Sequence, residues 1–387
     1  MKRHQPKAFV VAARRSAIGR IGGLHRLRRI EDLTAPIIAK ALTDAGIALE
    51  DVDEVVLGNA TAGGNPARLV ALASGLGDAV PAVTIDRQCA SGLEAIAQAA
   101  RLIATGEARI VVAGGMESLS TAPWRVMRPR NPYLMPHFAG FDQGHGMGES
   151  RLVDAAETIA QRFQISRARQ DAYAVATRRS AAAADDRKAF ATEIVPLKLE
   201  RNETRDESLS SFADDEELAE LPVFREPDGS VTQGNAASMH DGAAICIVVS
   251  AEVMARLRKP AAVAILGAAS CGAAAGEEAT ASIEAFRRLK TRVNGALPAK
   301  LPLVELSEAS AAEAIAFRDG VGVSEDALNP EGGSLARGYP FAAASAVTAV
   351  RVFHQLTRRN GEAQQDVGVA VSGGLGGIGT AVAFERV

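Results

Sequence analysis

Two segments far apart in this chain share one pattern, which constrains the fold more than any other feature. Each is a short β-branched run that ends at two glycines, RIVVAGGM at residues 109–116 and VGVAVSGGL at residues 367–375. Short apolar runs bounded by glycine are typical of buried strands. Because this strand ending occurs in both halves of the chain, the sequence predicts a duplicated domain with an active site between the halves.

Strand and helix patterns alternate on both sides of a less regular middle region. The first part has strand patterns at residues 9–12, 54–59, 83–86 and 108–113, and helix patterns at 33–45, 66–74 and 90–105. The last part has strand patterns at 262–267, 303–306 and 367–371, and helix patterns at 280–289, 309–317 and 342–356. This alternation predicts an α/β fold with buried strands between layers of helices.

The middle region begins where prolines and aromatic residues crowd together after residue 119. Helices are expected at 155–163 and 167–185, the second with Ser166 as its N-cap, and an acidic irregular stretch follows. We therefore expect an N-terminal half at 1–118, an inserted loop domain at 119–245 and a C-terminal half at 246–387.

Composition excludes several classes of function. The chain has 387 residues and a formal net charge of −3, so no basic face predicts nucleic acid as a partner. No apolar stretch approaches 18 residues, and the N-terminal apolar run is too short for a signal peptide. The three cysteines are odd in number and lack metal-site spacing, which predicts a reduced cytoplasmic protein without disulfides or metal.

A glycine motif near the C-terminus imitates a nucleotide-binding fingerprint. Residues 374–379, GLGGIG, satisfy G-x-G-x-x-G after a strand. A dinucleotide site needs a helix next, whereas the tail that follows, TAVAFERV, has a strand pattern. We therefore expect no nucleotide site here.

Cys89 is the main candidate for chemistry, because it lies between a short β-branched run and an Ala-rich helix. A thiol at a helix N-terminus faces unpaired N–H groups and the positive end of the helix dipole, which favours the reactive thiolate. The same N–H groups can hold the oxyanion formed when a thiolate attacks a thioester. The alternative is a buried packing cysteine.

Four segments together resemble the thiolase family along essentially the whole chain. They are DRQCASGLEAI at 86–96, VAGGMESLS at 112–120, GNAASMHDGAA at 234–244 and EGGSLARGYP at 331–340. The resemblance implies two similar α/β halves in a five-layered α-β-α-β-α core, with an inserted loop domain that shapes a coenzyme A tunnel. It also implies a coenzyme A thioester as substrate, no permanently bound cofactor, and a dimer or a tetramer of dimers.

Thiolases carry four catalytic positions, and the resemblance places only one of the usual residues here. Cys89 matches the nucleophile. Ser307 stands at the asparagine position, and Tyr339 stands at the activating histidine position in Gly-Tyr-Pro. Gly373 aligns with the second cysteine, and a shift of one residue puts Ser372 there instead.

These replacements remove the groups that catalyse formation and cleavage of a carbon–carbon bond. Glycine cannot remove an α-proton, and serine without a partner base is too weak to do so. Tyr339, with a reference pKa of about 10, is a neutral donor rather than a base. Loss of one oxyanion donor costs about 10²–10³ in rate. We therefore expect an acyltransferase that has lost ordinary thiolase turnover, with Ser307 and Tyr339 as the remaining hydroxyl donors.

The binding positions also depart from the family pattern. Met147 and Ser270 match positions on the coenzyme A path, and His145 lies near that path by resemblance. However, Ser210 replaces an arginine that contacts the nucleotide, and the Pro-rich segment before the second half's first helix reads Glu277-Glu-Ala-Thr. The donor of the acyl group is therefore expected to be either an acyl-CoA or an acyl carrier protein.

Histidines are the first candidates to replace the missing base. We considered His137, His145 and His240, each of which is alternatively a surface or hydrogen-bonded core residue. Cys246 and Cys271 are expected to be buried packing thiols. Glu117 and Glu308 are expected to tie the backbone near the site.

Three hypotheses follow. In the first, Cys89 takes an acyl group from coenzyme A or an acyl carrier and passes it to an acceptor that needs no second cysteine. In the second, the chain is a catalytically degenerate subunit that stabilises a heteromeric partner. In the third, it is a working acetyl-CoA acetyltransferase with a rearranged base.

Overall fold

The computed structural model describes residues 7–127, 129, 131, 133–135, 137–139, 149–197, 203–210, 215–258, 261–274, 276–358 and 366–387. The strands that form the body of the molecule are β1 (Ala8–Arg15), β2 (Gly19–Arg20), β3 (Glu54–Gly58), β4 (Ala82–Ile85), β5 (Ile110–Glu117), β8 (His240–Ser250), β9 (Val263–Gly272), β10 (Val304–Ser307), β11 (Val367–Gly374) and β12 (Ile378–Arg386). Their order is β10-β11-β12-β9-β1-β8-β5-β3-β4, and β2 pairs with β8.

The helices are α1 (Ile30–Ala45), α2 (Pro66–Ala73), α3 (Ser91–Thr105), α4 (Glu149–Arg162), α5 (Arg167–Asp186), α6 (Asp215–Glu220), α7 (Ala251–Arg256), α8 (Glu278–Arg292), α9 (Ala311–Val321), α10 (Ser334–Arg337) and α11 (Phe341–Arg358). Local sequence sets many of their ends. Ser166 caps α5 by accepting from the Arg169 N–H, as predicted. Gly46 and Gly106 end α1 and α3 in the left-handed conformation that glycine adopts without strain. In the part of the chain that the structure describes, none of the helices combines the length and apolar character needed to cross a bilayer.

The two halves repeat one strand order, which confirms the predicted duplication. In the N-terminal half, β3 is parallel to β5, and β8 lies antiparallel between β5 and β1. In the C-terminal half, β10 is parallel to β11, and β12 lies antiparallel between β11 and β9. We call these two sets of strands the N-terminal arm and the C-terminal arm of the sheet. A short pairing of β1 with β9, at Phe9–Ala264 and Val10–Val263, joins the two arms.

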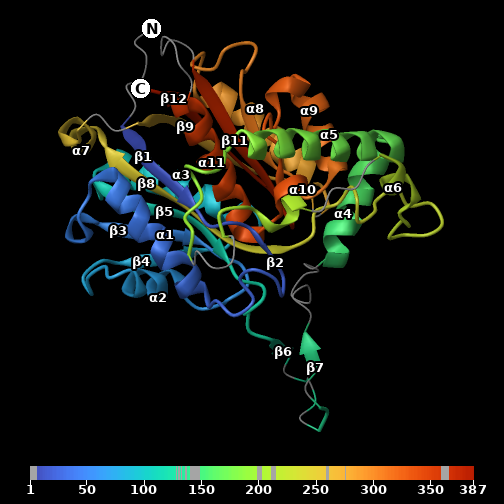
Figure 1. The fold of residues 1–387 in the computed structure, drawn as a ribbon, viewed down its shortest axis with the longest axis horizontal. Helices are drawn as coiled ribbons and strands as arrows, with labels where there is room; N and C mark the ends of the chain where they lie inside the picture. The colour runs from blue at the N-terminus through green and yellow to red at the C-terminus, as the bar shows by residue number, and fades with distance from the viewer. Residues whose placement is uncertain are drawn as a thin grey trace.

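The layers follow from which faces are apolar. One core packs α1 and α2 against the N-terminal arm, and another packs α8 and α9 against the C-terminal arm. A central core contains α3 and α11, which contact both arms. Figure 1 shows the blue N-terminal half and the orange-to-red C-terminal half side by side. The expected α-β-α-β-α fold is confirmed.

The middle of the chain supplies α4, α5 and α6 and a two-stranded hairpin of β6 (Arg125–Met127) and β7 (His137–Ala139). The hairpin projects from the body of the molecule (Figure 1). The expected domain boundary at 245/246 falls inside β8, which pairs with β5 and β1. The three-part division of the chain stays a prediction.

A buried cluster of charged side chains ties the middle region to both halves. Glu193 accepts from Arg15 Nε at 2.7 Å and from Arg351 Nη1, and all three side chains are buried. Arg15 also forms a bidentate pair with Asp206, at 2.6 and 2.9 Å. The Phe190 ring lies under Arg15 and Arg351, with the Arg351 guanidinium 4.7 Å from its centroid. The cluster therefore links β1 to α11. The first residue of α11 comes directly after the Gly-Tyr-Pro motif that contains Tyr339.

Candidate active site

Cys89 lies at a tight turn between β4 and α3, as predicted. Gln88, just before it, has a φ of 54°, which is strained for a residue with a side chain. The Ser91 hydroxyl fixes the turn, because it accepts from the Arg87 N–H at 2.8 Å and donates to the Gln88 carbonyl at 2.5 Å. The C-terminal half closes on the same turn: a Cβ added to Gly374 would lie 3.0 Å from the Arg87 carbonyl oxygen.

The resting state of the Cys89 thiol differs from the sequence-based expectation. The side chain is only 1% exposed, and this burial raises the pKa of the Cys89 thiol to about 12. Interactions of the sulfur with the Tyr339 hydroxyl and the Leu375 N–H lower its pKa, but burial outweighs them. The expectation that the helix N-terminus favours the thiolate is therefore wrong for the resting site, where the thiol is protonated.

The N–H groups at the start of α3 are less available than expected. The Ala90 and Ser91 N–H groups donate to the Arg87 and Gln88 carbonyls, at 3.2 and 3.0 Å. The Leu93 N–H donates to the Ser345 hydroxyl at 3.1 Å. These three donors are used by the turn and by α11, so the expectation that they hold an oxyanion is not supported.

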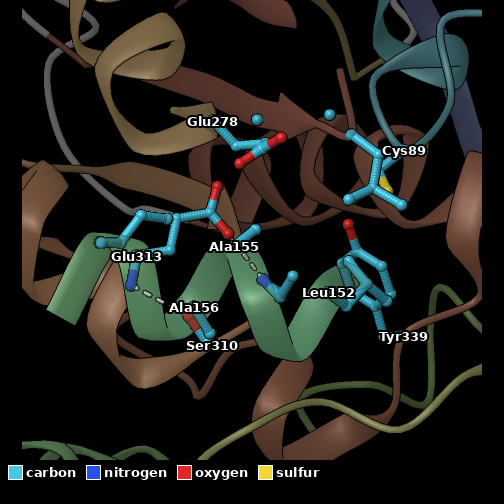
Figure 2. A pocket seen from close by; sticks show the side chains of 13 residues that line it. Cys89, Leu152, Ala155, Ala156, Glu278, Ser310, Glu313 and Tyr339 are labelled. Carbon is cyan, nitrogen blue, oxygen red and sulfur yellow. Dashed lines mark hydrogen bonds between the residues drawn. The ribbon is translucent and has the colours of Figure 1, made fainter. Parts of the chain in front are cut away.

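A small cavity of about 20 Å³ lies beside the sulfur. Its lining comes from both halves and from the middle region: Cys89, Leu152, Ala155, Ala156, Ile159, Glu278, Ala309, Ser310, Glu313, Tyr339, Gly373, Gly374 and Leu375. Figure 2 shows α4 along one side of it and the Tyr339 hydroxyl pointing toward Cys89. The volume suits about one water molecule.

The four positions taken from the resemblance come together here. Tyr339 and Gly373 line the cavity with Cys89. Ser307, at the end of β10, is fully buried and interacts with the Tyr339 phenol, although its Oγ has no hydrogen bond of regular geometry to any described residue. Ser372, the alternative to Gly373, is not among the lining residues; its hydroxyl donates to the Gly373 carbonyl at 2.9 Å.

Two acidic residues at the cavity were not among the sequence-based candidates. Glu278 begins α8, and Glu313 lies in the first turn of α9. Burial raises the pKa of both carboxyls, that of Glu313 to about 8. Figure 2 shows the two carboxyl groups pointing toward one another at the cavity. One signal was present in the sequence, since Glu278 belongs to the segment that replaces the family's Pro-rich stretch.

The expected coenzyme A positions are only partly described. Met147 and His145 lie outside the described residues, as does the side chain of His137. Ser270 is described: its hydroxyl donates to Glu94 on α3 at 2.9 Å and is not part of the cavity lining. Its assignment to the coenzyme A path stays a prediction.

His240 lies at a different place from the Cys89 cavity. It lines a larger cavity of about 390 Å³, where its Nε2 is 2.7 Å from the Ser208 hydroxyl. Burial lowers the pKa of His240, and its backbone N–H donates to the Tyr339 carbonyl at 2.9 Å. His240 therefore holds the Tyr339 segment in place and is not positioned as a base for Cys89.

The remaining candidates have the structural roles that were expected. Cys246 and Cys271 are buried free thiols. Glu117 accepts from Asn59 Nδ2 at 2.8 Å, from the Thr61 hydroxyl and from the Ala342 N–H. Glu308 accepts from Asn329 Nδ2 at 2.9 Å. Both carboxyls tie backbone segments together near the site.

This duplicated α/β fold, with a cysteine between its halves, defines the class of protein. Two family models match, Thiolase, N-terminal domain, over residues 8–252, and Thiolase, C-terminal domain, over residues 259–386. The chain belongs to the thiolase family. The expected class of enzyme, an acyltransferase of the thiolase superfamily, is confirmed.

Known proteins match over nearly the full length. A "Beta-ketoadipyl-CoA thiolase" of Pseudomonas putida is 36% identical over 98% of this chain and 99% of that protein. An "Acetyl-CoA acetyltransferase" of Pseudomonas aeruginosa is 33% identical over 97% of this chain and 98% of that protein. The crystal structure of the Bacillus anthracis acetyl-CoA acetyltransferase superimposes with a TM-score of 0.90 at 30% identity, covering 100% of both chains.

Proposed function

We propose that this protein is an acyltransferase that forms an acyl thioester on Cys89 and passes the acyl group to an acceptor. The observation that carries the proposal is the Tyr339 hydroxyl, which points toward Cys89 at a cavity between the halves and lowers the pKa of its thiol. A hydrogen-bond donor aimed at sulfur stabilises the thiolate that attacks and later leaves. A cysteine that only packs the core, such as Cys246, has no such partner among the described residues: burial alone raises its pKa to about 12.

The first half-reaction exchanges one thioester for another. The Cys89 sulfur bonds to the acyl carbon, the bond from that carbon to the donor sulfur breaks, and the donor leaves as a thiol. In the second half-reaction the acceptor bonds to the acyl carbon, and the Cys89 thiol is restored. Ser307 and Tyr339 supply the hydroxyl groups beside the reacting sulfur.

The donor is proposed to be an acyl-CoA, with an acyl carrier protein as the alternative. The relatives are named for acetyl-CoA and β-ketoadipyl-CoA, so acetyl-CoA and a β-ketoacyl-CoA are the first donors to try.

The active form is proposed to be a homodimer or homotetramer. Tyr133, Leu134 and Met135, at the tip of the projecting β6–β7 hairpin, are strongly exposed, and exposed apolar side chains of this kind support a contact between subunits. A heteromeric partner would bind the same surface in the second hypothesis.

Acylation of Cys89 is the expected result when the protein is mixed with acetyl-CoA or acetoacetyl-CoA at neutral to mildly alkaline pH. Intact-mass measurement should show one acyl adduct per chain, and peptide mapping should place it on Cys89. Cys89→Ala should remove the adduct, whereas Cys246→Ala, a matched change at another buried thiol, should retain it. A folded protein that gives no adduct with several acyl-CoA donors and an acyl carrier donor would contradict the proposal.

A further inference from the structure

Glu278 and Glu313 are buried carboxyls with oxygens left unsatisfied at the Cys89 cavity. Their side chains are 6% and 3% exposed. Among the described residues, neither Oε2 of Glu278 nor Oε1 of Glu313 has a hydrogen-bond partner. A buried carboxyl oxygen without a partner is costly, so its retention calls for an explanation.

Helix capping accounts for only one of the two Glu313 oxygens. Ser310 caps α9 by accepting from the Glu313 N–H at 3.1 Å, and Glu313 Oε2 accepts from the Ala309 N–H at 2.9 Å. This reciprocal arrangement resembles a capping box, which needs one acceptor oxygen on the residue at 313. The second oxygen, Oε1, is not part of the cap and lines the cavity.

Gly373 makes room for that second oxygen. A Cβ added to Gly373 would lie 2.3 Å from Glu313 Oε1, closer than any non-bonded contact allows. The Glu313 carboxyl therefore occupies the space that a side chain at position 373 would fill. Because β11 packs against the turn that carries Cys89, this space belongs to the Cys89 cavity.

The protonated Cys89 thiol needs a base before it can attack a carbonyl. Burial raises the pKa of Tyr339 well above its ordinary value, so its phenol does not accept the proton. Of the described residues around the cavity, only Glu278 and Glu313 are carboxylates. Glu313 has the larger electrostatic effect on the Cys89 thiol of the two, and the cavity has room for about one water, through which a base can act.

We propose that Glu313 is the general base of this site. As the Cys89 sulfur bonds to the acyl carbon, the thiol proton passes to the Glu313 carboxylate, and it then passes to the sulfur of the leaving coenzyme A. In the second half-reaction Glu313 takes the proton of the acceptor and returns it to the Cys89 sulfur. No proton is gained or lost over the cycle. This inference rests on the proposed function and names the base that it requires.

The surroundings of Glu313 set the pH at which it can act. Burial, together with the negative charges of Glu278 from α8 and Glu308 from the β10–α9 connection, raises its pKa to about 8, although the hydrogen bond from the Ala309 N–H lowers it. Cys89 and Tyr339, from the other side of the cavity, are neutral in the resting site. Since only the ionised carboxylate accepts a proton, the acylation rate should rise about tenfold between pH 7 and pH 9.

The test is rapid mixing of each variant with acetyl-CoA, acid quench and intact-mass measurement of the Cys89 adduct at several pH values. Glu313→Gln should lower the acylation rate by about 10²–10⁴-fold and remove the rise with pH. Glutamine also serves in a capping box, so the α9 cap and the fold should be retained. Glu284→Gln, an exposed change on α8, is the matched control and should behave as wild type.

The Glu278→Gln variant distinguishes Glu313, the proposed base, from its neighbour Glu278. Removing the Glu278 charge should move the midpoint of the pH profile to lower pH while leaving fast acylation at pH 9, which a merely structural change would not do. Wild-type rates from Glu313→Gln, or a slow Glu278→Gln beside a fast Glu313→Gln, would overturn the assignment. A flat wild-type profile from pH 7 to pH 9 would also overturn it, even if Glu313→Gln failed to fold. Absence of any wild-type adduct is the distinct result that removes the proposed function itself.

Discussion

Replacing Tyr339 with phenylalanine is expected to slow the acylation of Cys89 by about 10²–10³-fold, the usual cost of losing one donor to a developing charge. The Tyr339 hydroxyl points toward Cys89 and opposes the effect of burial on the pKa of the thiol. Phenylalanine keeps the ring and its edge-to-face contact with Phe341, so only the donor is lost. The measurement is the rate of adduct formation with acetyl-CoA by quenched mass spectrometry.

Glu284→Gln, the exposed change on α8 used above, is the control here as well. It should acylate at the wild-type rate. Thermal unfolding should give similar midpoints for both variants. A Tyr339→Phe protein that is folded and acylates as fast as wild type would show that the hydroxyl has no part in the chemistry.

Replacing Glu193 with glutamine is expected to lower the free energy of unfolding by about 3–5 kcal/mol, the cost of removing one partner from a buried ion pair. Glu193 is fully buried between Arg15 and Arg351, and the change removes the negative charge that both guanidinium groups face. Urea unfolding followed by circular dichroism measures the difference. Glu252→Gln, in an exposed pair with Arg256 on α7, should change stability by only about 0–1 kcal/mol.

The effect of Glu193 should also depend on pH in a defined direction. The neighbouring arginines outweigh burial and hold the pKa of Glu193 at about 2, below its ordinary value of 4.5. A carboxyl whose folded-state pKa is depressed contributes stability above the unfolded-state pKa and loses it as the pH falls toward the folded-state value. The difference between wild type and Glu193→Gln should therefore shrink from pH 4.5 toward pH 2. A difference that stays constant over this range would contradict the assigned role.

The α/β layers were predictable because local periodicity carries them. The paired glycine endings at 114–115 and 373–374 located equivalent strands in the two halves, and both are confirmed as β5 and β11. The final strand, β12, was also expected from the tail sequence. Strand β8 was not among the predicted strands, and its first residues, His240, Asp241 and Gly242, are polar or small and have the composition of a loop. Pairing with β2 and β5 makes them a strand, and pairing partners distant in the chain are not visible in a local pattern.

The location of the site was predictable, but its electrostatics were not. The turn at Cys89 was encoded locally, whereas its burial comes from Tyr339, Leu375 and α4, which reach it only after folding. Helix-dipole reasoning therefore gave the wrong protonation state. Glu313 was not recognised as a candidate for a related reason. Ser310 and Glu313 form an ordinary helix-capping pattern in the sequence, and the room that Gly373 leaves for the second Glu313 oxygen is visible only in the folded structure. The search for a base among histidines led to His240, which lies at another cavity.

If acyl transfer passes through a thioester on Cys89, a pre-steady-state measurement of coenzyme A release should detect its formation. On rapid mixing with excess acetyl-CoA in the absence of an acceptor, wild type should release one equivalent of free coenzyme A per chain and then stop or slow. Cys89→Ala should release none. Release of coenzyme A by Cys89→Ala at the wild-type rate, or wild-type turnover without a stoichiometric first phase and without an adduct, would contradict the account.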